Sequence, residues 1–431
     1  MPSIIIKEKD KTSAEKIQYD DYTVLIPGNC ALASDSETAY SVTYANVNYT
    51  VENGSEFLFE TYEALKAIIG KGADLDKNHV SYHMAKRLLN LGMKVLYVVV
   101  VAKEISTTFF TKFEDRGLYD LRFITAGGFE IDKDIADAMN LSAARRGDAV
   151  ALFNIPEEYT IQDDDNQTKT TTKEIKTASD IIAFLDLLSN EKFNVGDIQE
   201  TPLKYGCAFA GTFNIDSEVI GSGTDKGKVE YPAYFNYLAC FASYIKSYAD
   251  WYAFAGSVRG VSPFGNITIV SGNFGDADIA ILQTRDLDSD SKGHSACNVI
   301  ANIRPYGNII WGNRTLHPIT LDPETNTAGL RASNFLNIRH LCSDIKKTVY
   351  RACRRFTFEP NSDTLWVRFS NEITPLLEKM KADQGIRGYK LIQETISKKA
   401  TLKATIRIIP IEAVEDFDIT VELADSIEIA E

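Results

Sequence analysis

The sequence predicts a multidomain protein that combines α/β and α+β architecture, with an extended β arm at each end. Three observations support this prediction. Apolar strands alternate with helices in the first half, and strands and one long amphipathic helix fill the second half. The first 22 residues alternate charges with little to bury, and the last 20 alternate acidic with apolar residues. With 431 residues, of which 44% are hydrophobic and 25% charged, the chain is long enough for two or three folded domains.

The first half has the helix-then-strand order of an α/β layer. The stretch SYHMAKRLLNLGM is predicted to be a helix ending near Gly92, and the apolar strand Val95 to Ala102 follows directly. The same order recurs where DIADAMNLSAARRGD runs into AVALFNIP. Strands that are apolar throughout need both faces of their sheet covered, which predicts an α/β domain over residues 23–257. The polar run Asp163 to Glu174 lacks periodicity and is predicted to be a surface loop.

The second half is dominated by one long helix and several strands. Residues Ser333 to Phe358 place apolar side chains on a 3.6-residue stripe, which predicts a single helix. Strands are expected in GNITIVSGNF, in GNIIWGNRTL (Gly307 to Leu316) and in TLKATIRIIPI. In GNIIWGNRTL the two isoleucines and Trp311 are expected in a buried strand, while Gly312 permits a turn. Together these elements predict a core domain over residues 258–411.

The long helix carries the sharpest charge asymmetry in an otherwise acidic chain. Its second face has six basic residues against the single Asp344: Arg339, Lys346, Lys347, Arg351, Arg354 and Arg355. A charge run of this kind is typical of a solvated surface, and it equally suits contact with an acidic partner.

The terminal segments are predicted to be arms that another chain orders. Residues 1–22 contain one short strand candidate (Ser3, Ile4, Ile5 and Ile6), followed by alternating charges. Residues 412–431 contain eight acidic residues and no basic residue. Apolar residues alternate with these acids, most regularly at Phe417, Ile419, Val421 and Leu423, which predicts a strand. So acidic a strand suits pairing with a basic surface.

Composition and motifs argue against several functional classes. A net charge of −14 disfavours nucleic acid or an anionic membrane as the main partner. The three isoleucines near the start are too few for a signal-peptide core, and the six scattered cysteines are expected to be reduced. No membrane anchor is expected, because the longest apolar run has eight residues.

Candidate catalytic and ligand-binding motifs are incomplete. The stretch Gly221 to Val229 lacks the hydroxyl residue of a phosphate loop, and Asp286 to Cys297 lacks the glycine and glutamate of a calcium loop. His79 and His83 have helical spacing but no zinc-protease glutamate between them, and no G-x-S-x-G elbow occurs. The sequence therefore predicts no catalytic residue, no cofactor and no metal.

The second half resembles the contractile tail sheath proteins of bacteriophages and of phage-tail-like contractile injection particles. The resemblance rests on SACNVIANIRPYGNIIWGNRTL (Ser295 to Leu316), on NIRHLCSDIKKTVYRACRRFTFEPNSDTLW (Asn337 to Trp366) and on TIRIIPIEAVEDFDITVEL. The first half is more loosely similar, through SYHMAKRLLNLGMKVLYVVVV and AARRGDAVALFNIP. Asn154 stands where the family usually has an acid, and VSPFGN replaces its usual turn. Trp311, Gly312 and Arg314 are the structural markers, and Arg314 is expected to be an interface or hydrogen-bonding residue.

The resemblance implies a non-enzymatic structural role. Sheath subunits stack as a helical homo-oligomer, with rings expected to be six-fold, around an inner tube protein, and they meet baseplate and tail terminator proteins. Residues 258–411 would then be the inner domain and residues 23–257 the outer one, while both arms add strands to neighbouring subunits. The basic face at Lys346, Lys347, Arg351, Arg354 and Arg355 is expected to touch the tube.

The resemblance also sets the expected location and the alternatives. It implies a virion tail, assembled in the bacterial host cytoplasm, whose contraction drives the tube through a cell envelope. The alternatives are the sheath of a bacterial contractile injection system and an α/β enzyme of unknown substrate.

Overall fold

The computed structural model describes residues 22–30, 39–70, 76–101, 104–163, 166–195, 198–221, 226–284, 293–321, 328–360, 362–394 and 402–411. The strand residues expected in the two arms, Ser3 to Ile6 and Phe417 to Leu423, lie outside the described residues.

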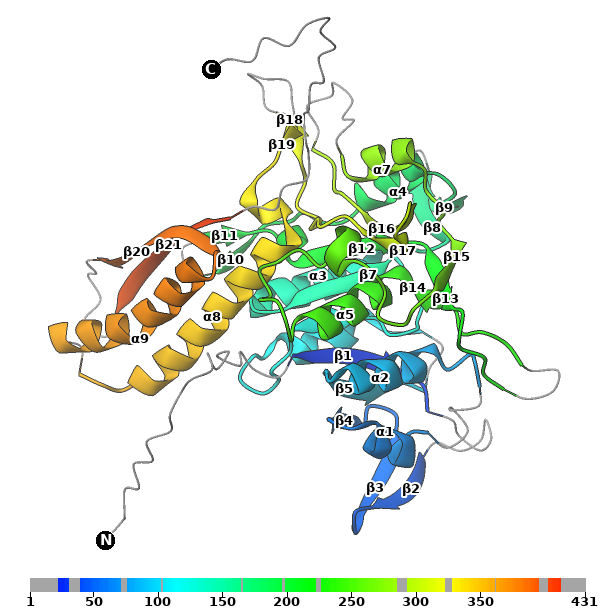
Figure 1. Ribbon diagram of the computed structural model, residues 1–431, viewed down its shortest axis with the longest axis horizontal. Coiled ribbons are helices and arrows are strands. Elements are labelled where there is room, and N and C mark those ends of the chain that lie inside the picture. Colours follow the sequence, from blue (N-terminus) through cyan, green and yellow to red (C-terminus); the bar gives the residue numbers. More distant parts are fainter. Residues whose placement is uncertain are drawn as a thin grey trace, which may run out of the picture.

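An eight-stranded sheet forms the centre of the protein (Figure 1). Its strands are β1 (Thr23–Gly28), β4 (Glu56–Phe59), β5 (Lys94–Val99), β6 (Phe123–Thr125), β7 (Val150–Asn154), β12 (Gly206–Ala210), β16 (Asn298–Ile303) and β17 (Gly307–Trp311). Their order is β17-β16-β12-β7-β6-β1-β5-β4. The strands between the two edges run parallel, whereas β17 and β4 pair antiparallel with their neighbours.

Helices cover both faces of this sheet, which is why its inner strands are apolar throughout. Val24 and Leu25 are neighbours in β1 that point to opposite faces and join two different cores. The helices of the first core are α1 (Tyr62–Ile68), α2 (Val80–Leu91) and α5 (Ala233–Tyr244). Those of the second are η2 (Thr107–Glu114), α3 (Lys133–Arg146), α4 (Ala178–Leu185), η3 (Pro202–Tyr205) and α7 (Asp276–Leu282). We call the sheet with these helices the body.

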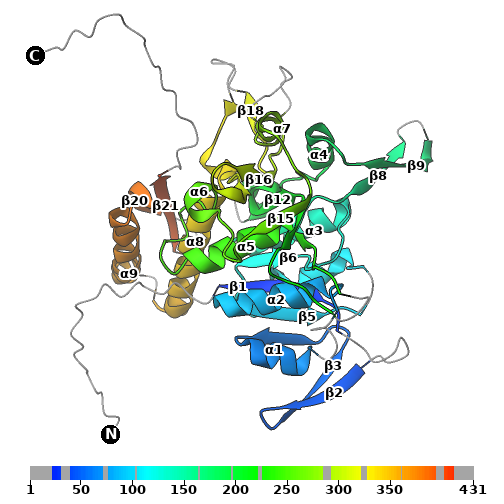
Figure 2. The ribbon, with the colours of Figure 1, turned by 45° about the vertical axis from the view of Figure 1, so that its right-hand side comes forward.

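Smaller sheets extend the body. They are the hairpins β2 (Ala39–Tyr44) with β3 (Val47–Glu52), β8 (Glu158–Asp163) with β9 (Asn166–Glu174), β10 (Phe193–Val195) with β11 (Ile198–Glu200), and β18 (Thr320–Leu321) with β19 (Ala328–Gly329). A three-stranded sheet contains β13 (Thr212–Ile215), β14 (Tyr231–Pro232) and β15 (Ile267–Ser271), and α6 (Gly256–Arg259) precedes β15. Figure 2 shows the hairpins β2–β3 and β8–β9 extending away from the central sheet.

A third apolar core is formed mainly by the C-terminal elements. Figure 1 shows these elements beside the body. The chain reaches it through η5 (Ala332–Asn334) and α8 (Leu336–Phe356), then continues as α9 (Asp363–Ala382), β20 (Ile386–Glu394) and β21 (Lys403–Pro410). We call α8 from Leu341 onward, with α9, β20 and β21, the C-terminal module. Leu336 belongs to a body core, whereas Leu341 and Ala352 belong to the core of the module. One helix is therefore shared by two cores.

The structure corrects the predicted domain boundary. A boundary between residues 257 and 258 would cut the central sheet, because β16 pairs with β12 and β17 closes that edge. Near residue 258 the predicted pattern changes from alternating helices and strands to mainly strands. This change marks the part of the chain that forms the antiparallel edge of the sheet, and it does not mark the start of a new core. The separate core begins only within α8, and Trp251 from the earlier part of the chain packs into it.

Two element predictions were also wrong in detail. The predicted surface loop Asp163 to Glu174 is largely strand β9, which pairs with β8 despite its polar sequence. The long helix begins at Leu336 and ends at Phe356, two to three residues inside the predicted bounds.

Candidate functional site

The segment GNIIWGNRTL is framework, with one exposed aromatic side chain. Ile309 and Ile310 are fully buried in β17, as predicted, but Trp311 is 37% exposed. The prediction of a buried Trp311 was therefore wrong. Trp311 is the last residue of an edge strand, so its side chain has neighbours from fewer directions than a side chain in an inner strand.

The residues after Trp311 are held by one buried amide. Gly312 has φ +115°, and a Cβ there would lie 2.6 Å from Oδ1 of Asn298 and 2.6 Å from Nε2 of Gln283. Asn298 accepts a hydrogen bond from the backbone N of Arg314 at 2.8 Å and donates to the carbonyl oxygen of Arg314 at 2.9 Å. The Arg314 side chain is buried, with its guanidinium carbon 4.8 Å from the Phe335 ring centroid. Of the two roles expected for Arg314, burial favours the structural one.

The first part of the basic face of α8 contacts the body. Lys346 donates a hydrogen bond to the Tyr205 hydroxyl at 2.8 Å, and Lys347 donates to Oδ1 of Asp120 at 2.6 Å. The Lys347 side chain is only 11% exposed. Burial lowers the pKa of Lys347 and the nearby Arg122 lowers it further, whereas Asp120 opposes the shift. Both lysines therefore serve internal contacts in this conformation.

The second part of the basic face is open to solvent. Arg351 donates to Oδ2 of Asp120 at 3.0 Å and keeps 43% of its side chain exposed. Arg354 and Arg355 are exposed, and Arg355 also pairs with Glu372 of α9. The five residues predicted to form one basic surface thus divide between an internal and an exposed group.

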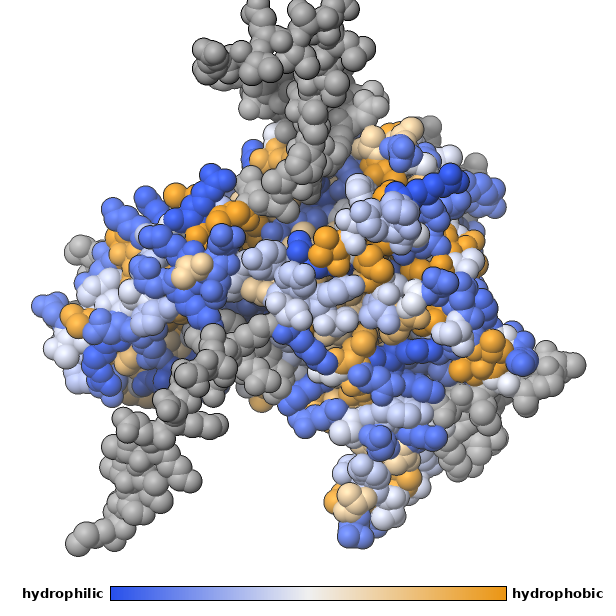
Figure 3. Space-filling model, in the orientation of Figure 1, coloured by the Kyte–Doolittle hydropathy of each residue, from blue (hydrophilic) through white to orange (hydrophobic). Residues whose placement is uncertain are grey.

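An exposed phenylalanine lies at the far end of this helix. Phe358 is 102% exposed and has φ +73°, a left-handed conformation that is costly for an aromatic residue. Arg368, which is 54% exposed, lies nearby in α9 and pairs with Glu359 at 3.1 Å. We call Arg354, Arg355, Phe358 and Arg368 the helix tip. In the view of Figure 3, the surface of the C-terminal module is mainly hydrophilic with separate apolar spots.

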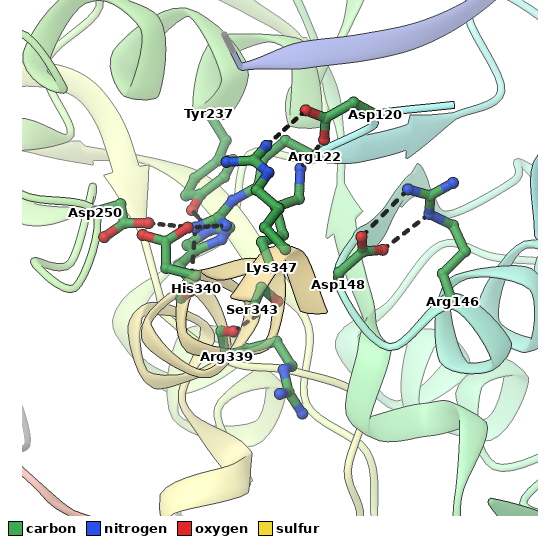
Figure 4. Close-up of polar contacts among 12 residues, drawn as sticks. Asp120, Arg122, Arg146, Asp148, Tyr237, Asp250, Arg339, His340, Ser343 and Lys347 are labelled. Atoms are coloured by element: carbon green, nitrogen blue, oxygen red, sulfur yellow. Dashed lines mark hydrogen bonds and ion pairs between the residues drawn. The ribbon is translucent and has the colours of Figure 1, made fainter. Parts of the chain in front are cut away.

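A buried polar network joins α8 to the body, and sequence reasoning missed it (Figure 4). Arg122, which precedes β6, donates to Oδ1 of Asp344 at 2.5 Å and also pairs with Asp250. It donates as well to the His340 carbonyl oxygen at 3.1 Å. The His340 ring nitrogen Nε2 lies 2.8 Å from the Tyr237 hydroxyl. Burial first, and then the nearby arginines, lowers the pKa of His340, which keeps the imidazole neutral.

The position of Asp344 and Arg339 corrects the predicted basic face. Asp344 is 4% exposed, and Arg339 is 9% exposed with its guanidinium carbon 4.4 Å from the Tyr205 ring centroid. Neither belongs to a solvated surface. A possible sequence signal was the single acid on this helix, since an isolated Asp among bases and apolar residues suits a buried arginine partner.

The C-terminal module lies within a region that is similar to a known protein domain. Residues 332–424 match the sequence profile of the phage tail sheath C-terminal domain. We call these residues the sheath domain, after the family that they match. The matched residues begin with η5 and include α8, α9, β20 and β21. The match then continues past Ile411, the last residue that the structure describes. The resemblance drawn from Asn337 to Trp366 is thereby confirmed.

The fold of the whole chain is that of contractile sheath proteins. A chain of the contracted PVC sheath complex, from an extracellular contractile injection system, has a TM-score of 0.62 at 15% identity, over 99% of this chain and 98% of that one. A chain of the six-fold symmetrised anti-feeding prophage (AFP) baseplate has a TM-score of 0.59 at 11% identity, over 98% and 99%. A chain of the contracted AFP baseplate has a TM-score of 0.57 at 12% identity, over 98% of each chain. A comparison with curated protein sequences gives no match.

Within the sheath domain, β20 and β21 present one basic face to solvent. Tyr389, Leu391 and Ile406 pack against the core of the module, whereas Lys390, Lys403, Arg407 and Ile409 on the opposite face are exposed. Lys390 and Arg407 lie directly opposite one another in the ladder. Like charges in such a pair repel, so this face is suited to an acidic neighbour.

The described residues contain no group of three or more possible ligands that could hold a metal ion. His83 is buried and its ring lies 2.9 Å from the Asp76 carbonyl oxygen, so it has a structural contact. Within the same residues, no helix is both long enough and apolar enough to cross a membrane.

Proposed function

We propose that this chain is the structural subunit of a contractile sheath, which polymerises around an inner tube and contracts to drive that tube through a cell envelope. The observation that carries this proposal is the combination of the sheath domain at residues 332–424 with a sheath fold over 99% of the chain. Contraction needs no bond chemistry, because rigid-body repacking of subunit interfaces releases the free energy of a metastable array. The proposed role is therefore non-enzymatic.

We place the chain in a particle tail assembled in the bacterial host cytoplasm. Its proposed partners are further copies of itself in six-fold rings, an inner tube protein, a baseplate and a terminator protein. An injection system is the specific alternative to an infectious phage, because the similar structures come from contractile injection particles. Purified particles that carry a DNA-filled head favour the phage, whereas headless particles favour the injection system.

The two terminal segments are the proposed links between subunits. Ile411, the last described residue before the segment 412–431, donates its backbone N–H to the Gly385 carbonyl oxygen at 3.2 Å, so the described part of the chain ends beside the start of β20. The eight acids of this segment complement the exposed basic face of β20 and β21 in a neighbouring copy. An added strand of five or six residues makes roughly four to six backbone hydrogen bonds, each worth about 0.5–1.5 kcal/mol net.

The helix tip is the proposed tube-facing surface. Lys346, Lys347 and Arg351 have contacts inside the chain, so the proposed surface rests on the exposed Arg354 and Arg355 at the end of the helix. Phe358 adds an apolar side chain that no neighbour covers within the described residues. The module would then face the tube, with the body outside it. Ion pairs of this kind are individually weak, and their number in a helical array makes the contact both stable and reversible.

Electron microscopy of the purified full chain tests the proposed function. Striated hollow tubes or cogwheel-shaped rings are the expected result, and a variant that lacks residues 412–431 should yield dispersed particles. Full-length protein that remains monomeric at high concentration, with its tube partner present, would refute the sheath assignment.

A further inference from the structure

The strongest unexplained cluster outside the proposed contact surfaces is the buried group of Arg122, Asp250 and Asp344. Their side chains are 1%, 2% and 4% exposed. They come from three parts of the chain: the segment before β6, the turn after α5, and α8. Together they join the body to the first turns of the C-terminal module.

The charges of this group do not balance. One guanidinium contacts two carboxyl groups, so two ionised carboxylates would leave one uncompensated negative charge in a buried site. The other charged groups nearby have their own contacts: Lys347 is engaged with Asp120, and the guanidinium of Arg339 lies over the Tyr205 ring. The buried His340 is held neutral beside Arg122 and Arg339, and Tyr22 and Tyr237 contribute neutral rings.

The hydrogen bonding points the same way. Oδ2 of Asp344 has no partner among the described residues, although Oδ1 binds Arg122. The two terminal nitrogens of Arg122 hold the carboxyl groups of Asp344 and Asp250 on one guanidinium. Two ionised carboxylates held in this way repel each other, and a proton on one of them removes the repulsion. Burial, followed by the charge of Asp344, raises the pKa of Asp250, and Arg122 only partly offsets this.

We propose that Asp250 and Asp344 share one bound proton, and that this proton forms a pH-sensitive latch between α8 and the body. With the proton, the group is neutral and its carboxyl groups are hydrogen-bonded. Without it, two like charges repel across the junction between body and module.

The sign of the pH dependence follows from the raised pKa. A carboxyl group that holds its proton more tightly in the folded state contributes stability that is present at low pH, and this contribution is lost as pH rises through the folded-state pKa. Release of one proton changes the equilibrium ratio between the state in which α8 contacts the body at this group and the state in which that contact is broken, by up to tenfold per pH unit.

Infrared spectroscopy and unfolding of the full chain test the latch. The wild type should show a protonated carboxylic acid band that disappears on alkaline titration, together with a fall in thermal stability over the same pH range. Asp344→Asn and Asp250→Asn each leave one carboxylate for Arg122, so both variants should lose the band and that part of the pH dependence.

The pair of Arg146 and Asp148 provides a matched control, because it is equally buried but has one carboxylate for its guanidinium (Figure 4). Asp148→Asn should leave the band intact. A wild type without the band, or a band that persists unchanged in both Asp250→Asn and Asp344→Asn, would overturn the proposal. The wild-type titration decides the question even where a variant does not fold.

Discussion

Replacement of Gly312 by alanine should destabilise the protein far more than the same change at Gly307. Both glycines have positive φ, +115° and +78°, so alanine meets backbone strain of roughly 1 kcal/mol at either position. Only at Gly312 does the new Cβ meet other atoms, at 2.6 Å from the side-chain amides of both Asn298 and Gln283. At Gly307 nothing lies within 4 Å of it.

The difference between the two variants isolates the steric contribution. Asn298 must move, which disturbs its hydrogen bonds to Arg314 and to the Ala208 carbonyl oxygen. Three such bonds are worth about 3 kcal/mol in total. The expected loss in the free energy of unfolding is therefore about 4 kcal/mol for Gly312→Ala and about 1 kcal/mol for Gly307→Ala.

Urea unfolding of the full chain, followed by tryptophan fluorescence, measures both values. Equal losses in the two variants would refute the reasoning, because backbone strain alone would then account for Gly312.

Three further predictions concern the tube contact, the arm and pH. Arg354→Glu with Arg355→Glu should abolish co-sedimentation with the tube protein but not self-assembly, whereas Arg145→Glu on the body should affect neither; tube binding by the double variant would contradict the proposed helix tip. Removal of residues 1–20 should leave a folded monomer that no longer polymerises, as tested by light scattering, and normal polymers would exclude the arm model. Burial first, and then nearby Lys204 and Arg331, lowers the pKa of His317 to about 4, so the folded state binds this proton less readily than the unfolded chain. The contribution of neutral His317 to the free energy of unfolding should be fully present above pH 6.5 and should be lost as pH drops from there towards 4. His317→Gln should show a smaller fall in stability over this range. An identical fall in that variant would assign the effect to other groups.

The layered fold was predictable because its signals are local. The predicted strand Val95 to Ala102 is apolar throughout, which requires cover on both sheet faces, and β5 (Lys94–Val99) has that cover. The long helix was predictable from its stripe. The pairing partner of each strand was not predictable, because strand pairing depends on contacts between residues far apart in the sequence. For that reason the pairing of β16 with β12 contradicts the predicted domain boundary between residues 257 and 258.

The candidate surfaces were predictable only in composition. The sequence shows that α8 is basic, but it does not show which bases face the body. Lys347 is engaged by Asp120, which lies 227 residues away in the chain, whereas Arg354 is exposed. Asp344 was assigned to the solvated face for the same reason, since its partner Arg122 comes from another element. Phe358 lies within the F-E-P-N stretch, yet its full exposure depends on a backbone conformation that local pattern does not specify.

The shared helix α8 has a mechanical consequence. Its 21 residues span about 31 Å at 1.5 Å per residue, with Leu336 fixed among the body side chains and Ala352 among those of the module. A hydrogen-bonded helix bends far less readily than a loop, so it transmits torque where a flexible linker would absorb it. A force applied at Phe358 therefore exerts a torque on α8 about its contacts with Arg122. Either the central sheet rotates together with α8, or the contacts between Arg122 and α8 break.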